Sequence, residues 1–239
     1  GIKNILGVSV GSLLGLMLAL KFTYKEIYEF SMKLDFSKIL NINNNKFFDI
    51  TSNFGFDDAK SFIRIVKIII KHKTNNSDIT FQELYRFGNK NLIIPGTNIT
   101  LAKSIFFNKD TYPNMKVWEA VTISCSIPMV YQPYKFENHL YLDGAIDQTF
   151  ITYFREKHKT LNLIVENISD IKKDIETFSE FIKSLIFYNM RNKRQQNFDI
   201  RNTIDFKSGN EINPIDFDID SETKIKIYNL GYEETKRRI

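Results

Sequence analysis

The 239-residue sequence is poor in the residues that form disulfides, bind metals or shape tight turns. It has one cysteine, three histidines, five prolines and ten glycines. The lone Cys125 excludes an internal disulfide framework and a zinc site built on clustered cysteines. Its apolar surroundings favour a small buried side chain over a nucleophile. Hydrophobic residues make up 43% and charged residues 26% of the chain, which is typical of a globular protein with a sizeable core.

The charge balance is mildly basic, with a formal net charge of +5. A basic surface favours anionic partners, either phospholipid head groups or nucleic acid. The compact basic run formed by Arg191, Lys193 and Arg194 is typical of a solvated helix face. The sequence has no aromatic and basic motif of a known nucleic-acid-binding module, so we do not expect nucleic acid as a partner.

Short apolar runs alternate with helical patterns through most of the chain. Two capping boxes, at Thr23 with Glu26 and at Thr80 with Glu83, predict helix starts. The alternation predicts an α/β fold, a three-layer α/β/α sandwich with a mostly parallel central sheet. No repeat or linker is visible, so we expect a single domain over 1–239. The expected strands lie at 3–6, 91–107, 139–142 and 161–165, and the expected helices at 11–21, 23–34, 57–73, 115–126, 178–190 and 221–238.

The segment Gly7-Val8-Ser9-Val10-Gly11 matches the pattern G-x-S-x-G, with an apolar strand before it and a buried helix after it. This pattern places a serine on a sharp strand-to-helix turn, where small residues let the turn close. The helix start directs unpaired N–H groups at the serine, so the Val10 N–H is a candidate oxyanion donor. The alternatives are a signal sequence or membrane anchor over Ile5 to Leu20, or an ordinary glycine-containing core helix.

A nucleophilic serine needs a base, and Asp143 in "HLYLDGAI" is the best candidate. Asp143 ends an apolar strand, and the ends of strands are where the sites of α/β proteins assemble. Gly144 allows a close backbone approach beside it. A plain Asp-Gly turn is the alternative for this pair, and a triad of Ser9, Asp143 and His158 is the alternative for the chemistry.

Two segments together resemble the patatin-like phospholipase family. The first is "KNILGVSVGSLLGLMLAL" followed by "TYKEIYEF", which resembles the nucleophile segment of the family. The second is "MKVWEAVTISCSIPMVYQPYKFENHLYLDGAI", which resembles the block that leads from a helix through a small-residue turn to the strand bearing the catalytic Asp-Gly. The two segments stand in the family's order, and the resemblance covers about residues 3–150.

The resemblance implies a lipid acyl hydrolase of the phospholipase A or lysophospholipase type. Such a serine carboxylic-ester hydrolase works through a Ser–Asp dyad and an acyl-enzyme intermediate, without a metal or another cofactor. It further implies a phospholipid or other acyl-lipid substrate, transient contact with a membrane surface, and a cytoplasmic, peripherally membrane-associated protein. The corresponding positions are Ser9 as nucleophile, Asp143 as base, Gly7 and Gly11 as the glycines of the turn, and Gly144 and Ala145 as the rest of the Asp-Gly-Ala element.

The sequence departs from the family pattern before the nucleophile. Family members carry a glycine-rich oxyanion loop there, whereas only eight residues precede Ser9 and no Gly-Gly pair occurs. We therefore expect the chain to be N-terminally incomplete, without the first strand and that loop. The alternative function is a catalytically inactive patatin-fold module for lipid binding or interaction.

An interfacial patch is a further candidate, because four phenylalanines flank an Asn-rich stretch and lie near lysine-rich helices. The favoured interpretation is that these side chains cover the core under a long loop. The four residues are Phe47, Phe48, Phe54 and Phe56.

Overall fold

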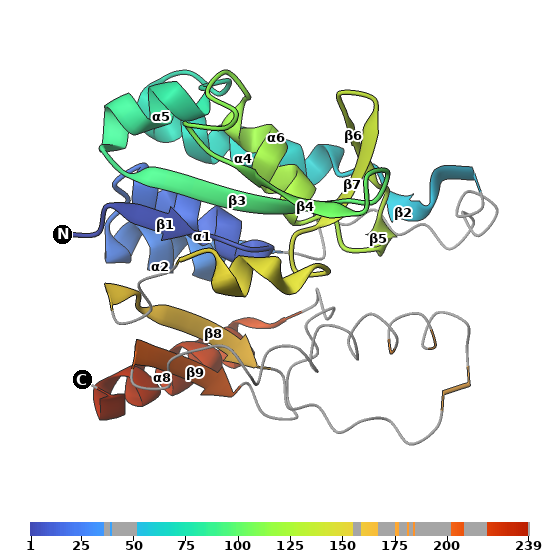
Figure 1. Ribbon diagram of the computed structural model, residues 1–239. Coiled ribbons are helices and arrows are strands. Elements are labelled where there is room, and N and C mark those ends of the chain that lie inside the picture. Colours follow the sequence, from blue (N-terminus) through green and yellow to red (C-terminus); the bar gives the residue numbers. More distant parts are fainter. Residues whose placement is uncertain are drawn as a thin grey trace. The chain divides into compact units, whose positions relative to one another are not determined.

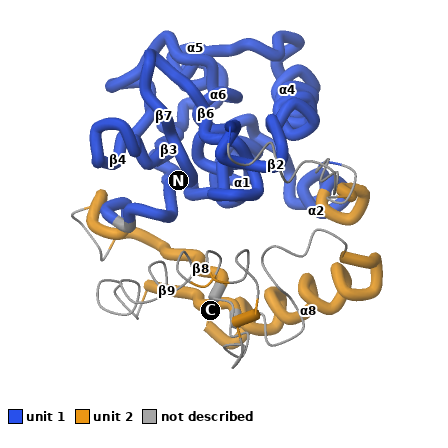
Figure 2. Tube along the Cα trace, turned by 90° about the vertical axis from the view of Figure 1, so that its right-hand side faces the viewer, with its two compact units in different colours: residues 1–30, 38–150 blue, residues 31–37, 151–239 orange. Residues whose placement is uncertain are grey.

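The computed structural model divides into two compact units. Unit 1 holds residues 1–30 and 38–150, and unit 2 holds residues 31–37 and 151–239 (Figure 2). The expectation of a single domain over the whole chain stays a prediction. The structure describes residues 1–35, 39, 52–154, 159–166, 175–176, 181, 184, 202–207 and 219–238.

The main sheet of unit 1 is organised around β3, which is buried along nearly its whole length. β1 runs parallel to the first half of β3, while β4 and β7 run antiparallel to its second half (Figure 1). β6 extends the sheet beyond β7. The strands are β1 (Asn4–Leu6), β3 (Asn91–Asn98), β4 (Lys103–Phe107), β6 (Tyr134–Phe136) and β7 (His139–Asp143).

The predicted α/β class is confirmed, but the sheet is mixed rather than mostly parallel. Among the described pairings of this sheet, the pair β1 and β3 is parallel and the others are antiparallel. A short connection explains the antiparallel pair β6 and β7. Glu137 and Asn138 join β6 to β7 with positive φ angles of 47° and 63°, and a two-residue turn of this kind joins antiparallel neighbours. Alternation of strands and helices along the chain does not reveal which strands share such a turn.

The helices of unit 1 pack on the main sheet and on one another. A Cβ at Gly15 of α1 would lie 3.0 Å from the Leu92 side chain, and one at Gly96 would lie 2.4 Å from Ile123 of α6. Leu92 and Gly96 are an even number of residues apart, so α1 and α6 cover the same face of β3. The helices are α1 (Val10–Ala19), α4 (Lys60–Thr74), α5 (Phe81–Gly88) and α6 (Val117–Ser124).

Helix starts follow the sequence signals where a capping box is present. α5 begins after Thr80 with both capping hydrogen bonds to Glu83, as predicted. α4 begins at Lys60 and not at Asp57, because Asp57 ends β2 (Gly55–Asp57), a strand that pairs in parallel with β5 (Met129–Tyr131).

Unit 2 contains a parallel pair of strands, β8 (Asn162–Glu166) and β9 (Thr203–Lys207), and the helix α8 (Ser221–Arg238). The strand and the terminal helix expected here are confirmed. The helix expected at 178–190 and the basic run at 191–194 lie outside the described residues.

Two helices have residues in both units, namely α2 (Tyr24–Lys33) and the 3₁₀ helix η3 (Gln148–Thr152). Within the described ranges, no helix combines the length and the hydrophobicity that crossing a membrane requires.

Candidate active site

Ser9 occupies the tight turn between β1 and α1. Its backbone has φ 52° and ψ −132°, a conformation that side-chain-bearing residues rarely adopt. A Cβ at Gly7 would lie 2.4 Å from the carbonyl oxygen of Gly11, so only glycine fits at position 7. A Cβ at Gly11 would meet nothing within 4 Å, so the expectation that the turn needs small residues on both sides holds for Gly7 alone.

Asp143, the last residue of β7, accepts a hydrogen bond from the hydroxyl of Ser9. The distance from Ser9 Oγ to Asp143 Oδ2 is 2.7 Å, and Asp143 is only 3% exposed. The second carboxylate oxygen, Oδ1, accepts the N–H of Ala145 at 2.8 Å. A Cβ at Gly144 would lie 2.3 Å from the carbonyl oxygen of Pro95, so glycine is required where the chain leaves β7. The carboxylate is therefore held with one oxygen directed at Ser9.

The C-terminal end of α6 holds the backbone of both residues. The N–H of Ser9 donates to Ser124 Oγ at 3.1 Å. The N–H of Gly144 donates to the Ser124 carbonyl at 3.3 Å, and the N–H of Asp143 donates to the Ser126 carbonyl at 2.9 Å. Because Ser124 is fully buried and bonds to both segments, it ties the serine turn to the aspartate strand.

Sequence reasoning assigned no role to Ser124. The available signal was a run of small polar residues, Ser124 to Ser126, at the end of a helix shortly before Pro128. Such a run indicates a tight helix end, but it does not identify which backbone groups the hydroxyls meet.

The start of α1 presents one N–H beside Ser9. The N–H groups of Gly11 and Ser12 donate to the carbonyls of Val8 and Ser9 at 2.9 and 2.8 Å. The N–H of Val10 forms no hydrogen bond with the residues that the structure describes, and Val10 is 62% exposed. The positive end of the helix dipole adds to this donor, so the turn offers a favourable place for a developing negative charge.

Cys125 is a buried thiol next to the site, as expected. Its Sγ lies 3.7 Å from the hydroxyl of Ser12. Burial raises the pKa of the Cys125 thiol far above its ordinary value, and the nearby charge of Asp143 raises it further. The thiol is therefore protonated at neutral pH and is a poor nucleophile.

Three of the other candidates lie outside the described residues, namely His158, Phe47 and Phe48. Phe54 is 59% exposed, which differs from a side chain that covers the core. Among the described residues, no group of three or more His, Cys, Asp or Glu side chains is arranged to hold a metal ion.

Residues 2–152 match the family described as "Patatin-like phospholipase". "Uncharacterized protein R571" of Acanthamoeba polyphaga mimivirus is 27% identical over 250 residues, covering 100% of this chain and 83% of that protein. "Probable lipid hydrolase 463L" of Invertebrate iridescent virus 6 is 28% identical over 165 residues, covering 66% of this chain and 56% of that protein.

Among solved structures, VipD from Legionella pneumophila aligns with a TM-score of 0.53 at 14% identity, covering 99% of this chain and 60% of VipD. The chain thus spans a little over half the length of VipD and of the iridescent virus hydrolase. At this identity the likeness to VipD concerns the fold. The family match covers unit 1 together with the serine turn and the aspartate strand, and the chain belongs to the patatin-like phospholipase family.

Proposed function

We propose that this chain hydrolyses fatty-acyl esters of phospholipids or related lipids, as a phospholipase A or lysophospholipase, through a dyad of Ser9 and Asp143. The observation that carries the proposal is the 2.7 Å hydrogen bond from the Ser9 hydroxyl to the buried Asp143 carboxylate. Family membership and the name of the iridescent virus relative support a lipid ester as the substrate class.

The first half-reaction forms an acyl-enzyme. Ser9 Oγ attacks the ester carbonyl carbon while its proton passes to Asp143 Oδ2. The negative charge that develops on the carbonyl oxygen is stabilised by the Val10 N–H at the start of α1. The carbon–oxygen bond to the alcohol then breaks, and the leaving alcohol takes the proton from Asp143.

The second half-reaction restores the enzyme. Water gives a proton to Asp143 and attacks the acyl carbon, and the bond between that carbon and Ser9 Oγ breaks. Ser9 regains its proton from Asp143, and the fatty acid is released. The Ala145 N–H on Oδ1 keeps Oδ2 directed at Ser9 through both steps.

Labelling with a fluorophosphonate probe, read by peptide mass spectrometry, tests the dyad. We expect modification at Ser9, slowed about 10²- to 10⁴-fold by Asp143→Asn, because the amide accepts no proton. Asp147→Asn is the matched control. Asp147 lies four residues after Asp143 and accepts a hydrogen bond from Ser104, and replacing its carboxylate should leave labelling of Ser9 intact.

Two results would contradict the proposal. Undiminished labelling in Asp143→Asn would exclude Asp143 as the base. A wild-type chain that is folded by circular dichroism but takes no label would favour the non-catalytic lipid-binding module.

A further inference from the structure

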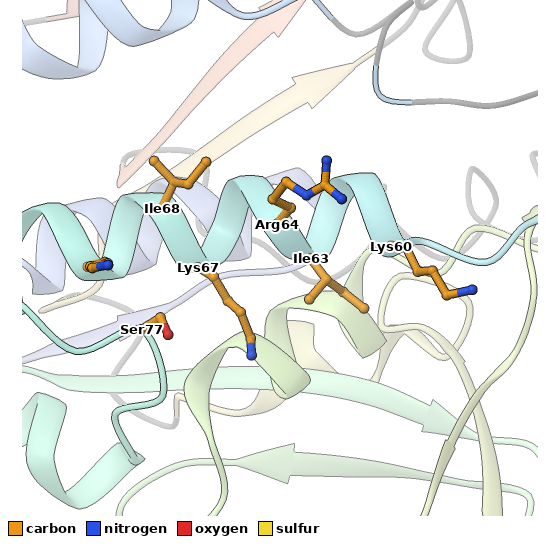
Figure 3. Close-up of a pocket in the computed structure, with 7 residues that line it drawn as sticks. Lys60, Ile63, Arg64, Lys67, Ile68 and Ser77 are labelled. Carbon is orange, nitrogen blue, oxygen red and sulfur yellow. The ribbon is translucent and has the colours of Figure 1, made fainter.

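A broad face of α4 carries a group of cationic side chains that are not part of the Ser9 and Asp143 site. Lys60, Arg64, Lys67 and Lys71 recur every three or four residues, which brings their side chains onto neighbouring rows of the helix surface. Together with three other residues they line a shallow hollow of about 360 Å³ (Figure 3). We call this surface the α4 basic face; it consists of Lys60, Ile63, Arg64, Lys67, Ile68, Lys71 and Ser77.

The opposite side of α4 is part of the core. Phe62, Val66, Ile69 and Ile70 are each at most 7% exposed. The helix is therefore fixed in its rotation about its axis, and the α4 basic face is a permanent part of the surface of unit 1.

Two of the cations are neutralised and two are not. Lys60 pairs with Asp58 at 2.6 Å, and Lys67 pairs with Asp78 at 2.9 Å. Arg64 and Lys71 are exposed and form no ion pair with any residue in the described ranges. Among the described residues, no acidic side chain pairs with the charges of Arg64 and Lys71 on this face.

An apolar side chain lies between these two cations. Ile68 is 61% exposed, and Figure 3 shows it leaving α4 on the same side as Arg64. Cations beside an exposed aliphatic group suit the head-group region of an anionic bilayer, where phosphates meet the cations and the aliphatic group leaves water. A partner that offers phosphates alone would not use Ile68.

The α4 basic face is connected to the dyad through α6. Lys67 Nζ lies 4.4 Å from the ring centroid of Trp118, near the start of α6. Ser124, at the end of α6, accepts the N–H of Ser9. The six residue steps from Trp118 to Ser124 span about 9 Å along the helix axis. Lys67 of the face and the backbone of Ser9 thus contact the two ends of the same short helix.

We propose that the α4 basic face docks this protein on bilayers that contain anionic phospholipids, with Arg64 and Lys71 against the phosphates and Ile68 among the head groups. This inference rests on the proposed lipid hydrolysis, since it names the surface through which the enzyme reaches an aggregated substrate. The complementarity of charge between the face and the bilayer surface is its basis.

Vesicle co-sedimentation of the whole chain tests the docking. We expect binding to vesicles of phosphatidylcholine mixed with phosphatidylserine, weakened by added salt, and little binding to phosphatidylcholine alone. The double variant Arg64→Gln with Lys71→Gln should lower the partition coefficient about 25-fold, because each cation near an anionic surface contributes about fivefold. Glutamine preserves helix propensity, and no ion pair with a described residue is lost.

The matched control is Lys103→Gln with Lys135→Gln. Both lysines are exposed, Lys103 on β4 and Lys135 on β6. Replacing them lowers the net charge by the same amount as replacing Arg64 and Lys71. We expect this variant to bind mixed vesicles like the wild-type chain. An equal loss of binding in both double variants would show that net charge alone causes the effect and would overturn the inference. Equal binding of the wild-type chain to both kinds of vesicle would also overturn it.

Measuring vesicle binding in the Ser9→Ala background separates docking from catalysis. Both double variants should keep fluorophosphonate labelling of Ser9 when Ser9 is present. If labelling fails while anionic vesicles still bind through Arg64 and Lys71, docking is supported and catalysis is not. If a duplex oligonucleotide binds through these two residues and vesicles do not, the face recognises nucleic acid and the inference is wrong.

Discussion

Ser9 has a backbone conformation that costs about 1–3 kcal/mol in an isolated chain, so neighbouring groups must stabilise it. Gly7 gives the turn the space it needs, and the Ser124 hydroxyl accepts the N–H of Ser9. Because the carbonyl of Ser124 also accepts the N–H of Gly144, one buried residue sets the position of Ser9 relative to Asp143. Ser124 is thus a positioning residue, since it acts through Ser9 and Gly144.

Replacing Ser124 with alanine tests this role. We expect Ser124→Ala to slow fluorophosphonate labelling of Ser9 about tenfold and to lower the free energy of unfolding by about 1–3 kcal/mol, because the part-buried N–H of Ser9 loses its acceptor. Ser126→Ala is the control, since the Ser126 hydroxyl, just after α6, donates to the Thr122 carbonyl of that helix. If both variants lose stability to a similar extent and slow labelling equally, Ser124 has only a structural role.

At the scale of elements, α2 is tied to α4 by a carboxylate. Glu26 closes the capping box with Thr23 at the start of α2 and accepts a hydrogen bond from Lys73 at 2.6 Å. The Lys73 ammonium first, and then the Thr23 N–H, lower the pKa of Glu26 from 4.5 to about 2. One side chain thus both begins a helix and links it to another.

The lowered pKa of Glu26 makes this link dependent on pH. A carboxyl whose folded-state pKa lies below its unfolded value contributes stability fully above about pH 4.5, and the contribution is lost as the pH falls toward 2. We expect Lys73→Gln to raise the pKa of Glu26 toward 4.5, measured by NMR titration of the carboxyl carbon. A titration of Glu26 that Lys73→Gln leaves unchanged would show that Lys73 does not make the link.

At the scale of the whole molecule, the chain has two compact units but two helices that cross their boundary. α2 and η3 each have residues in both units. Unfolding one unit alone would divide each helix, and short helix fragments are unstable in water. The prediction of a single domain over 1–239 therefore depends on whether the two units unfold together.

Calorimetry tests the single-domain prediction. We expect one thermal transition for the whole chain, with equal calorimetric and van't Hoff enthalpies. Fluorescence of Trp118 in unit 1 and far-ultraviolet circular dichroism should change at the same temperature. Two resolved transitions would show that the units unfold as separate domains.

Much of the fold and the contact between Ser9 and Asp143 could be predicted because the signals are local. The capping boxes at Thr23 and Thr80 begin helices through contacts within one turn. The pattern around Ser9 and the strand-end position of Asp143 depend on backbone demands of a few residues, so the pair could be named and its hydrogen bond anticipated. The exposure of Phe54 and the start of α4 were missed because they depend on distant partners.

The α/β class, the serine turn and the aspartate at a strand end follow from spacing and residue type over short distances, so the amino-acid sequence is enough to predict them. Three other features emerge only in the folded chain: β3 has antiparallel neighbours, Ser124 joins the two halves of the site, and Arg64 and Lys71 lie on an exposed face without ion pairs to described residues. These features depend on which segments meet in space. A hydroxyl or a cation has its role decided by neighbours that the chain brings together only when it folds.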